Sequence, residues 1–210
     1  MTGVSEHTLK EFVDTCRETG RRGLVRCSSG NMSCRLDEQR FLATASRSWM
    51  ESLSEDEVAV CRIADGEVIE GPKPTVEVEF HAGILRTRPD INVVLHFQTT
   101  YATALACRAT ENINYFVIPE IPFYIGPVAG VPYLTPGSAK LAEAVTEAMR
   151  DHDMAVMANH GQVTVAKDYA CAIQNAEFFE LACQIIVLNG NAIAPLPESA
   201  TKHLAESRQA

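Results

Sequence analysis

The sequence predicts a single α/β domain over residues 1–210, in which helices flank a mixed or largely antiparallel central sheet. Short β-prone runs alternate with helix-like stretches along the chain, and no internal repeat divides it. The dipeptide Asp65-Gly66 between two β-prone runs predicts an early hairpin, so the sheet is not purely parallel. Because 46% of the 210 residues are hydrophobic, one domain of this length can bury a full core.

The first half of the chain predicts a long helix, several short strands and a second helix. Ser5 can cap the first helix, whose apolar residues recur at helical spacing, and Gly20 and Gly23 end it. The second helix, over about 76–88, stops before Pro89 because the residue before a proline resists the helical conformation. The predicted strands lie within residues 27–35, 41–44, 58–63 and 68–69.

The second half of the chain predicts further strands and helices in alternation. Ser138 can cap one helix, and Asp168 can cap a long helix that ends at Asn189-Gly190. The proline-containing tail over 191–210 is predicted to be mobile. The other predicted segments are a strand at 92–96, a helix at about 100–108, short strands and turns over 112–134, and paired strands at 154–157 and 162–166.

The composition restricts the class of partner and the compartment. With a formal net charge of -9 and no block of Lys or Arg, the chain lacks the charge pattern of a nucleic-acid-binding protein. Its 7 cysteines never form a Cys-x-x-Cys pair, which indicates free thiols in a reducing cytoplasm. The N-terminus lacks the apolar segment of a signal peptide, and no apolar run reaches membrane-spanning length. We therefore expect a soluble cytoplasmic protein without a membrane partner.

Two histidines and a glutamate are candidate metal ligands. His96 ends one apolar run, His160 follows another, and Glu77 precedes a helix-like stretch. Strand ends hold side chains rigidly at the edge of a cleft, and two imidazoles with a carboxylate suit a catalytic zinc site. The alternative is a pair of hydrogen-bonded core histidines and a glutamate that complements a helix dipole. Spacing alone favours this alternative, because no short-range ligand motif is present. Tyr115 and Tyr124 are candidate acid–base residues, although a tyrosine in an apolar run is usually part of the core.

A polar turn near the start of the chain is a candidate anion site. The turn Ser28-Ser29-Gly30-Asn31 offers hydroxyls, an accessible glycine backbone and an amide to a phosphate or another oxyanion. Ser46 and Thr75 could converge on the same anion. The alternative is a turn whose composition serves only local hydrogen bonds.

Taken together, these segments resemble the class II aldolase and adducin family from about Gly23 to Leu188. The order and spacing of the motifs are more specific than any one of them, and they favour the metal-site interpretation. The motifs are Ser29-Gly30-Asn31-Met32-Ser33, Thr75-Val76-Glu77 with Phe80-His81, Arg88-Pro89-Asp90 before Val93-Val94-Leu95-His96, Tyr101-Ala102-Thr103-Ala104-Leu105, Asn159-His160-Gly161, and Ala176-Glu177 with Glu180.

The resemblance implies a metal-dependent lyase that cleaves a phosphorylated ketose, such as L-fuculose 1-phosphate, into dihydroxyacetone phosphate and an aldehyde. His96 and His160 would hold a zinc ion, and Glu77 would be a further ligand or the base, which needs a raised pKa. Tyr124 follows Ile118-Pro119-Glu120-Ile121 and is the best match to the catalytic tyrosine of the family. Family members are homotetramers with active sites between subunits, so a homo-oligomer is expected.

The chain departs from the family pattern in the phosphate pocket that Asn31, Ser46 and Thr75 would line. Val76 stands where the family has a serine, which removes one hydroxyl. Arg47 stands where the family has a glycine, and its guanidinium could bind the phosphate or block its entry.

Two further departures concern the chemistry. Gln98 stands where the family has the second histidine of a His-x-His pair, and an amide oxygen is a weaker zinc ligand than imidazole. Phe123, not Tyr124, occupies the tyrosine position in an ungapped alignment. The alternatives are a metal-dependent epimerase, dehydratase or decarboxylase of the same family, and a metal-free, adducin-like interaction module. Retention of the other three metal ligands argues against the module.

Overall fold

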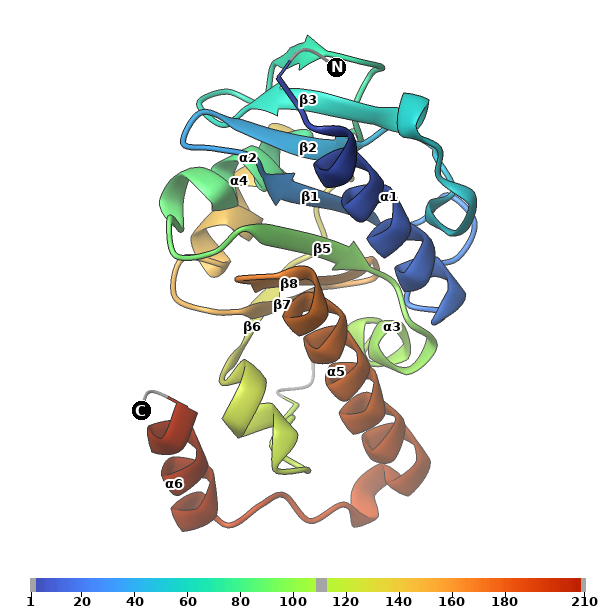
Figure 1. The fold of residues 1–210 in the computed structure, drawn as a ribbon. Coiled ribbons are helices and arrows are strands. Elements are labelled where there is room, and N and C mark those ends of the chain that lie inside the picture. The colour runs from blue at the N-terminus through green and yellow to red at the C-terminus, as the bar shows by residue number, and fades with distance from the viewer. Residues whose placement is uncertain (1–2, 109–112, 209–210) are drawn as a thin grey trace.

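The computed structural model describes residues 3–108 and 113–208, and over these residues helices cover both faces of an eight-stranded sheet (Figure 1). The strands are β1 (Asn31–Arg35), β2 (Arg40–Thr44), β3 (Val58–Arg62), β4 (Val68–Glu70), β5 (Val93–Phe97), β6 (Val128–Val131), β7 (Met154–Met157) and β8 (Gly161–Ala166). Their order in the sheet is β4-β3-β2-β1-β5-β8-β7-β6, and all neighbouring pairs are antiparallel except β6 and β7. The prediction of one α/β domain with a largely antiparallel sheet is confirmed.

The two faces of the sheet carry separate hydrophobic cores. One core lies beneath α1 (Glu6–Arg21), α3 (Thr100–Ala106) and α5 (Tyr169–Asn189), and the other lies beneath α2 (Val78–Thr87) and α4 (Ala139–Ala148) (Figure 1). Successive side chains of a strand point to opposite faces, so Leu95 and Phe97 enter the first core and Val94 enters the second. His96 shares the face of Val94 and therefore points towards α2, where Phe80 meets its ring edge-on.

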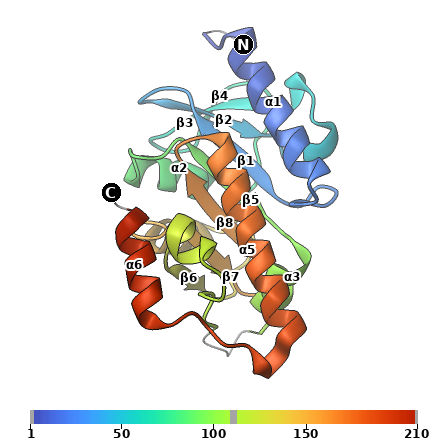
Figure 2. The ribbon, with the colours of Figure 1, turned by 60° about the horizontal axis from the view of Figure 1, so that its bottom comes forward.

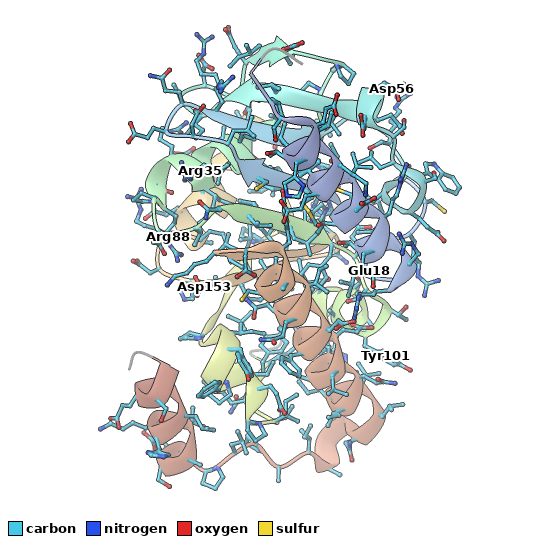
Figure 3. All side chains as sticks on the ribbon, in the orientation of Figure 1. Glu18, Arg35, Asp56, Arg88, Tyr101 and Asp153 are labelled. Atoms are coloured by element: carbon cyan, nitrogen blue, oxygen red, sulfur yellow. The ribbon has the colours of Figure 1, made fainter. Side chains whose placement is uncertain are left out.

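Two arginines fix the C-terminal end of α2 against one end of the sheet (Figure 3). Arg35 on β1 donates hydrogen bonds to the carbonyl oxygens of Leu85, at 2.6 Å, and of Arg88, at 3.2 Å. Arg88 forms an ion pair of 2.9 Å with Asp153, just before β7. These contacts help to set the position of Glu77, which is the residue preceding α2 at its other end.

Helix starts and the early hairpin agree with the predictions. The side chains of Ser5, Ser138 and Asp168 each accept a hydrogen bond from the backbone N–H three residues further on, as helix N-caps do. Gly66 adopts a φ of 76° in the turn between β3 and β4, a conformation that glycine reaches without strain.

Two segments contain helices that the sequence analysis did not predict. Residues 113–134 contain a short π-helix (Ile121–Ile125) before β6, and residues 109–112 lie outside the described part of the chain. The tail contains the helix α6 (Glu198–Arg208), which packs against the π-helix (Figure 2). The sequence interpretation missed α6 because a polar helix that is held by a tertiary contact has weak apolar periodicity.

The helix α5 is long and apolar enough, by length and composition, to cross a membrane. In this fold it is the central helix of one core, and its side chains Ala172, Phe179 and Cys183 are fully buried. On the same helix, Leu181 and Leu188 are 43% and 68% exposed. Packing against the sheet therefore buries the apolar residues on one side of α5, whereas Leu181 and Leu188 on another side remain exposed.

Candidate active site

Three residues that lie far apart in the sequence converge at one end of the inner strands β5 and β8. Glu77 precedes α2, His96 lies on β5, and His160 lies in the turn between β7 and β8. His96 Nε2 is 3.5 Å from Glu77 Oε2, and His160 Nε2 is 3.4 Å from Glu77 Oε1. One ligand atom from each residue lies within 4.8 Å of the others. The structure thus brings the predicted ligands together. The alternative, a pair of core histidines and a separate helix-start glutamate, does not require these three side chains to meet.

The backbone of β8 orients the His96 ring. His96 Nδ1 donates a hydrogen bond of 2.9 Å to the carbonyl oxygen of Gln162, so the proton of the neutral ring is on Nδ1. The lone pair of Nε2 then faces Glu77. A backbone carbonyl that accepts the proton of the second ring nitrogen is the usual partner of a metal-binding histidine.

The turn between β7 and β8 places His160 beside His96. Asn159 adopts a φ of 54°, a left-handed conformation that asparagine tolerates, and its N–H donates to the carbonyl oxygen of Ala106. Gly161 follows, and a Cβ there would lie 2.6 Å from Gln98 Cγ, 2.7 Å from a carbonyl oxygen of β5 and 3.0 Å from His96 Cε1. The absence of a side chain at Gly161 therefore lets the two histidines approach.

The environment of Glu77 favours its ionised form. Burial raises the pKa of this carboxyl group, but electrostatic interaction with the His96 ring, a hydrogen bond from Asn31 and electrostatic interaction with the His160 ring together outweigh burial and hold the pKa below its usual value. The expectation of a raised pKa is therefore wrong for this structure. Burial and the neighbouring His96 lower the pKa of His160, which favours the neutral imidazole that binds metals.

The residues present fit a divalent metal ion. Glu77 Oε1 is buried and has no hydrogen-bond partner among the described residues, so the site contains an unpaired acceptor. The 3.4 and 3.5 Å separations between the ring nitrogens and the carboxylate exceed normal hydrogen bonds. They are close to the distance of about 3.3 Å between neighbouring ligands of a tetrahedral zinc ion. Two imidazoles and one carboxylate also leave a coordination position open, as in catalytic zinc sites.

A polar cavity of about 260 Å³ adjoins this cluster. Its lining includes every predicted metal and phosphate residue: Ser29, Gly30, Asn31, Ser46, Arg47, Thr75, Glu77, His96, Gln98 and His160. Arg47 is exposed at this cavity and adopts a φ of 66°, which is strained for a residue with a long side chain. Several predicted phosphate ligands already have local partners, since Ser29 Oγ accepts from the N–H of Arg26 and Thr75 Oγ1 accepts from the N–H of Glu77.

Tyr124 lies away from this cavity. It belongs to the π-helix, is 40% exposed, and stacks on Phe178 of α5 with ring centroids 5.3 Å apart. It is not one of the cavity-lining residues in the described part of the chain. Phe123, the ungapped match, contacts Tyr124 edge-on in the same helix.

The structure adds residues that the sequence interpretation did not assign. Ser48 and Pro136 also line the cavity, together with Ser28 of the predicted polar turn and Val76 of the Thr75-Val76-Glu77 motif. Behind Glu77, Asn31 hydrogen-bonds to His81, which hydrogen-bonds to Ser33. His81 and Ser33 belong to the family motifs, and the signal that could have singled them out is spacing: His81 follows Glu77 by one helical turn, and Ser33 follows Asn31 on the same face of β1.

A helix-flanked antiparallel sheet with a carboxylate and two imidazoles converging at a polar cavity is the arrangement of a metal-dependent enzyme. The chain belongs to the class II aldolase and adducin family, because residues 10–187 match the model of the Class II Aldolase and Adducin N-terminal domain. The chain is therefore an enzyme of this family, and the predicted resemblance is confirmed.

Named relatives include both decarboxylases and aldolases. The 3-oxo-tetronate 4-phosphate decarboxylase of Haemophilus influenzae is 31% identical over 208 residues, covering 97% of this chain and 98% of the relative. The L-fuculose phosphate aldolase of Methanocaldococcus jannaschii is 34% identical over 180 residues, covering 86% and 96% of the two chains. Among solved structures, an L-fuculose 1-phosphate aldolase superposes with a TM-score of 0.86 at 27% identity, covering 99% of this chain and 98% of that chain.

Proposed function

We propose that this protein is a metal-dependent lyase that breaks a carbon–carbon bond next to the ketone of a small phosphorylated substrate. The observation that carries the proposal is the meeting of Glu77, His96 and His160 at a cavity lined with hydroxyl groups and one arginine. When bound, a divalent cation such as Zn²⁺ supplies Lewis-acid stabilisation for the negative charge that develops on the ketone oxygen. His96 and His160 would hold it, and Gln98 lies on the same cavity as a weaker oxygen ligand.

Glu77 is the group that we expect to move the proton at the substrate carbon. It is the only carboxylate among the described residues that line the cavity, and it is ionised. Bond cleavage leaves an enediolate, and Glu77 would transfer a proton from solvent to its carbon, which completes the product.

The phosphate group would bind at the opposite side of the cavity, at Arg47 and the hydroxyl groups of Ser46, Ser48 and Thr75. Arg47 has no ion pair or hydrogen bond with another residue in the described part of the chain, and its guanidinium suits bidentate contact with an anion. Asn31 has less capacity for phosphate than the family resemblance implies, because its amide already contacts Glu77 and His81.

The first candidate reaction is decarboxylation of a phosphorylated 3-oxo acid such as 3-oxo-tetronate 4-phosphate. The bond between the carboxylate carbon and its neighbour breaks, CO₂ leaves, and the electron pair forms the enediolate of dihydroxyacetone phosphate. Carbon dioxide needs no acid or base on the leaving side. This suits a cavity whose titratable lining residues, within the described chain, are Arg47, Glu77, His96 and His160.

The second candidate is the aldol cleavage implied by the family resemblance, with L-fuculose 1-phosphate as a substrate. It produces the same enediolate but needs a base for the hydroxyl of the departing aldehyde. The observation in its favour is the exposed position of Tyr124 beside the apolar side of α5, which includes Leu181 and Leu188. We propose that a second copy of the chain covers this surface in a homo-oligomer, a homotetramer by resemblance, and brings Tyr124 to a neighbouring cavity.

The proposed compartment is the cytoplasm. All seven cysteines are free thiols in the structure, which suits a reducing environment. The proposed partners are a small sugar phosphate and further copies of the chain, with neither nucleic acid nor a membrane.

An assay with both substrates tests the proposal. Zinc-loaded protein is incubated with 3-oxo-tetronate 4-phosphate or L-fuculose 1-phosphate, and dihydroxyacetone phosphate is measured together with CO₂ or the aldehyde. We expect dihydroxyacetone phosphate and CO₂ from the first substrate, and a kcat lower by about 10²–10⁴-fold in Glu77→Gln. A zinc-loaded protein that leaves both substrates intact would contradict the proposal, and a chain that binds no metal would favour the interaction module.

A further inference from the structure

Four buried polar side chains form a continuous chain of hydrogen bonds behind the candidate metal site. Asn31 Nδ2 lies 2.8 Å from Glu77 Oε2, and Asn31 Oδ1 lies 2.6 Å from His81 Nε2. The second ring nitrogen of His81, Nδ1, lies 2.7 Å from Ser33 Oγ. Glu77 and Asn31 are each 6% exposed, and His81 and Ser33 are fully buried. One face of β1 and one face of α2 therefore build a single polar network inside a hydrophobic core.

The Asn31 amide fixes the direction of each hydrogen bond in this network. Its Nδ2 donates to Glu77 Oε2, so its oxygen is the atom presented to His81. That oxygen only accepts, so His81 must carry its proton on Nε2 and accept at Nδ1 from the Ser33 hydroxyl. Burial lowers the pKa of His81 to about 3, which keeps the ring neutral as this arrangement requires.

The network leaves the two oxygens of Glu77 in different states. Oε2 receives the Asn31 amide, whereas Oε1 has no hydrogen-bond partner among the described residues and faces His160 Nε2 at 3.4 Å. We propose that His81 and Ser33 are positioning residues, which fix the Asn31 amide so that it turns the Glu77 carboxylate towards the metal and the substrate carbon. The catalytic purpose of this orientation rests on the proposed lyase function.

The surroundings make a single orientation of the Asn31 amide strongly preferred. Phe80 stacks on the His81 ring with centroids 4.7 Å apart and meets the His96 ring edge-on at 6.2 Å, so an apolar ring shields the network from water. Hydrogen bonds in such surroundings are electrostatically stronger than in water. A flipped Asn31 amide would set its oxygen against the Glu77 carboxylate and its N–H₂ group against the N–H of His81. His81 thus holds Glu77 through Asn31 and touches neither the metal nor the substrate.

Zinc titration separates this positioning role from simple packing. Zn²⁺ is titrated into chelator-treated, full-length wild-type protein and into the variants His81→Gln and His81→Phe. Glutamine places an N–H donor near the position of Nε2, whereas phenylalanine keeps the ring and removes the donor. We expect His81→Gln to keep its zinc affinity within about threefold and His81→Phe to lose about tenfold or more, as for other outer partners of metal ligands. An equal loss in both variants, or no loss in His81→Phe, would overturn the proposal.

Two further measurements decide the question if His81→Phe does not fold. Nitrogen-15 NMR of histidine-labelled, metal-free protein reports the tautomer of His81, and we expect the proton on Nε2. Ser33→Ala removes only the hydroxyl that faces Nδ1, and we expect it to weaken zinc binding while the His81 proton stays on Nε2 opposite the Asn31 oxygen. A proton on Nδ1 in the wild type, or an unchanged zinc affinity in Ser33→Ala, would refute the positioning role. Since no substrate is used, an inactive protein with the expected zinc and NMR results would refute only the lyase function.

Discussion

Substitution of Gly161 by alanine tests how closely the two histidine-bearing segments must approach. The added Cβ would lie 2.6 Å from Gln98 Cγ, 2.7 Å from the carbonyl oxygen of Phe97 and 3.0 Å from His96 Cε1. Two of these atoms belong to a strand backbone and a ring held by hydrogen bonding, so they cannot move freely. Forcing one methyl group into such a site costs about 1–3 kcal/mol of stability. For a chain of this size, each kcal/mol lowers Tm by roughly 2–4 °C.

Gly130→Ala is the matched control, because a Cβ at Gly130 on β6 would meet no atom within 4 Å. Urea unfolding of the two variants and the wild type gives the free energies, and zinc titration gives the metal affinities. We expect Gly161→Ala to lose stability and about tenfold or more in zinc affinity, since the His96 ring must shift. Gly130→Ala should stay within about 0.5 kcal/mol of the wild type. Equal behaviour of the two variants would refute the close approach of β5 and the β7–β8 turn.

Three further predictions follow from individual side chains. Arg47→Gly relieves a φ of 66°, so the free energy of unfolding should rise by up to about 1 kcal/mol while the KM for a phosphorylated substrate increases; a less stable variant with unchanged KM would contradict both parts. Gln98→His should tighten zinc binding in a titration, because imidazole is the better ligand, and an unchanged affinity would mean that Gln98 does not face the ion. The third prediction concerns pH. Burial lowers the pKa of His81 from 6.5 to about 3 in the folded protein, so between these pH values only the unfolded chain binds a proton at His81. The free energy of unfolding therefore falls as the pH decreases from 6.5 towards 3. His81→Gln removes this contribution, and its unfolding free energy should fall less steeply over the same range; identical slopes would show that His81 is not neutral in the folded protein.

Much of the fold and of the metal site could be predicted from local sequence patterns. Ser5, Ser138 and Asp168 precede apolar periodic segments, and each caps a helix in the structure. His96 and His160 follow apolar runs, and the ends of strands place such residues together when the strands are neighbours in the sheet. The family motifs supplied the pairing of these distant segments, which spacing alone could not.

The remaining features depend on packing between segments that are far apart in the sequence. The link from Asn31 to His81 joins residues 50 positions apart, and it exists only because α2 lies across β1. The positive φ of Arg47 could not be predicted from its residue type, because arginine rarely adopts this conformation and glycine is the residue expected there. The position of Tyr124 follows from a π-helix that packs on α5, and the apolar segment that forms it has no helical spacing to reveal it.

The most direct test of the metal site is an anomalous-difference map from crystals of the zinc-loaded protein, recorded at the zinc absorption edge. The predicted result is one strong peak at about 2.0–2.2 Å from Nε2 of His96, Nε2 of His160 and a carboxylate oxygen of Glu77. A map with no peak between these three side chains, or with zinc bound only at other residues, would contradict the account.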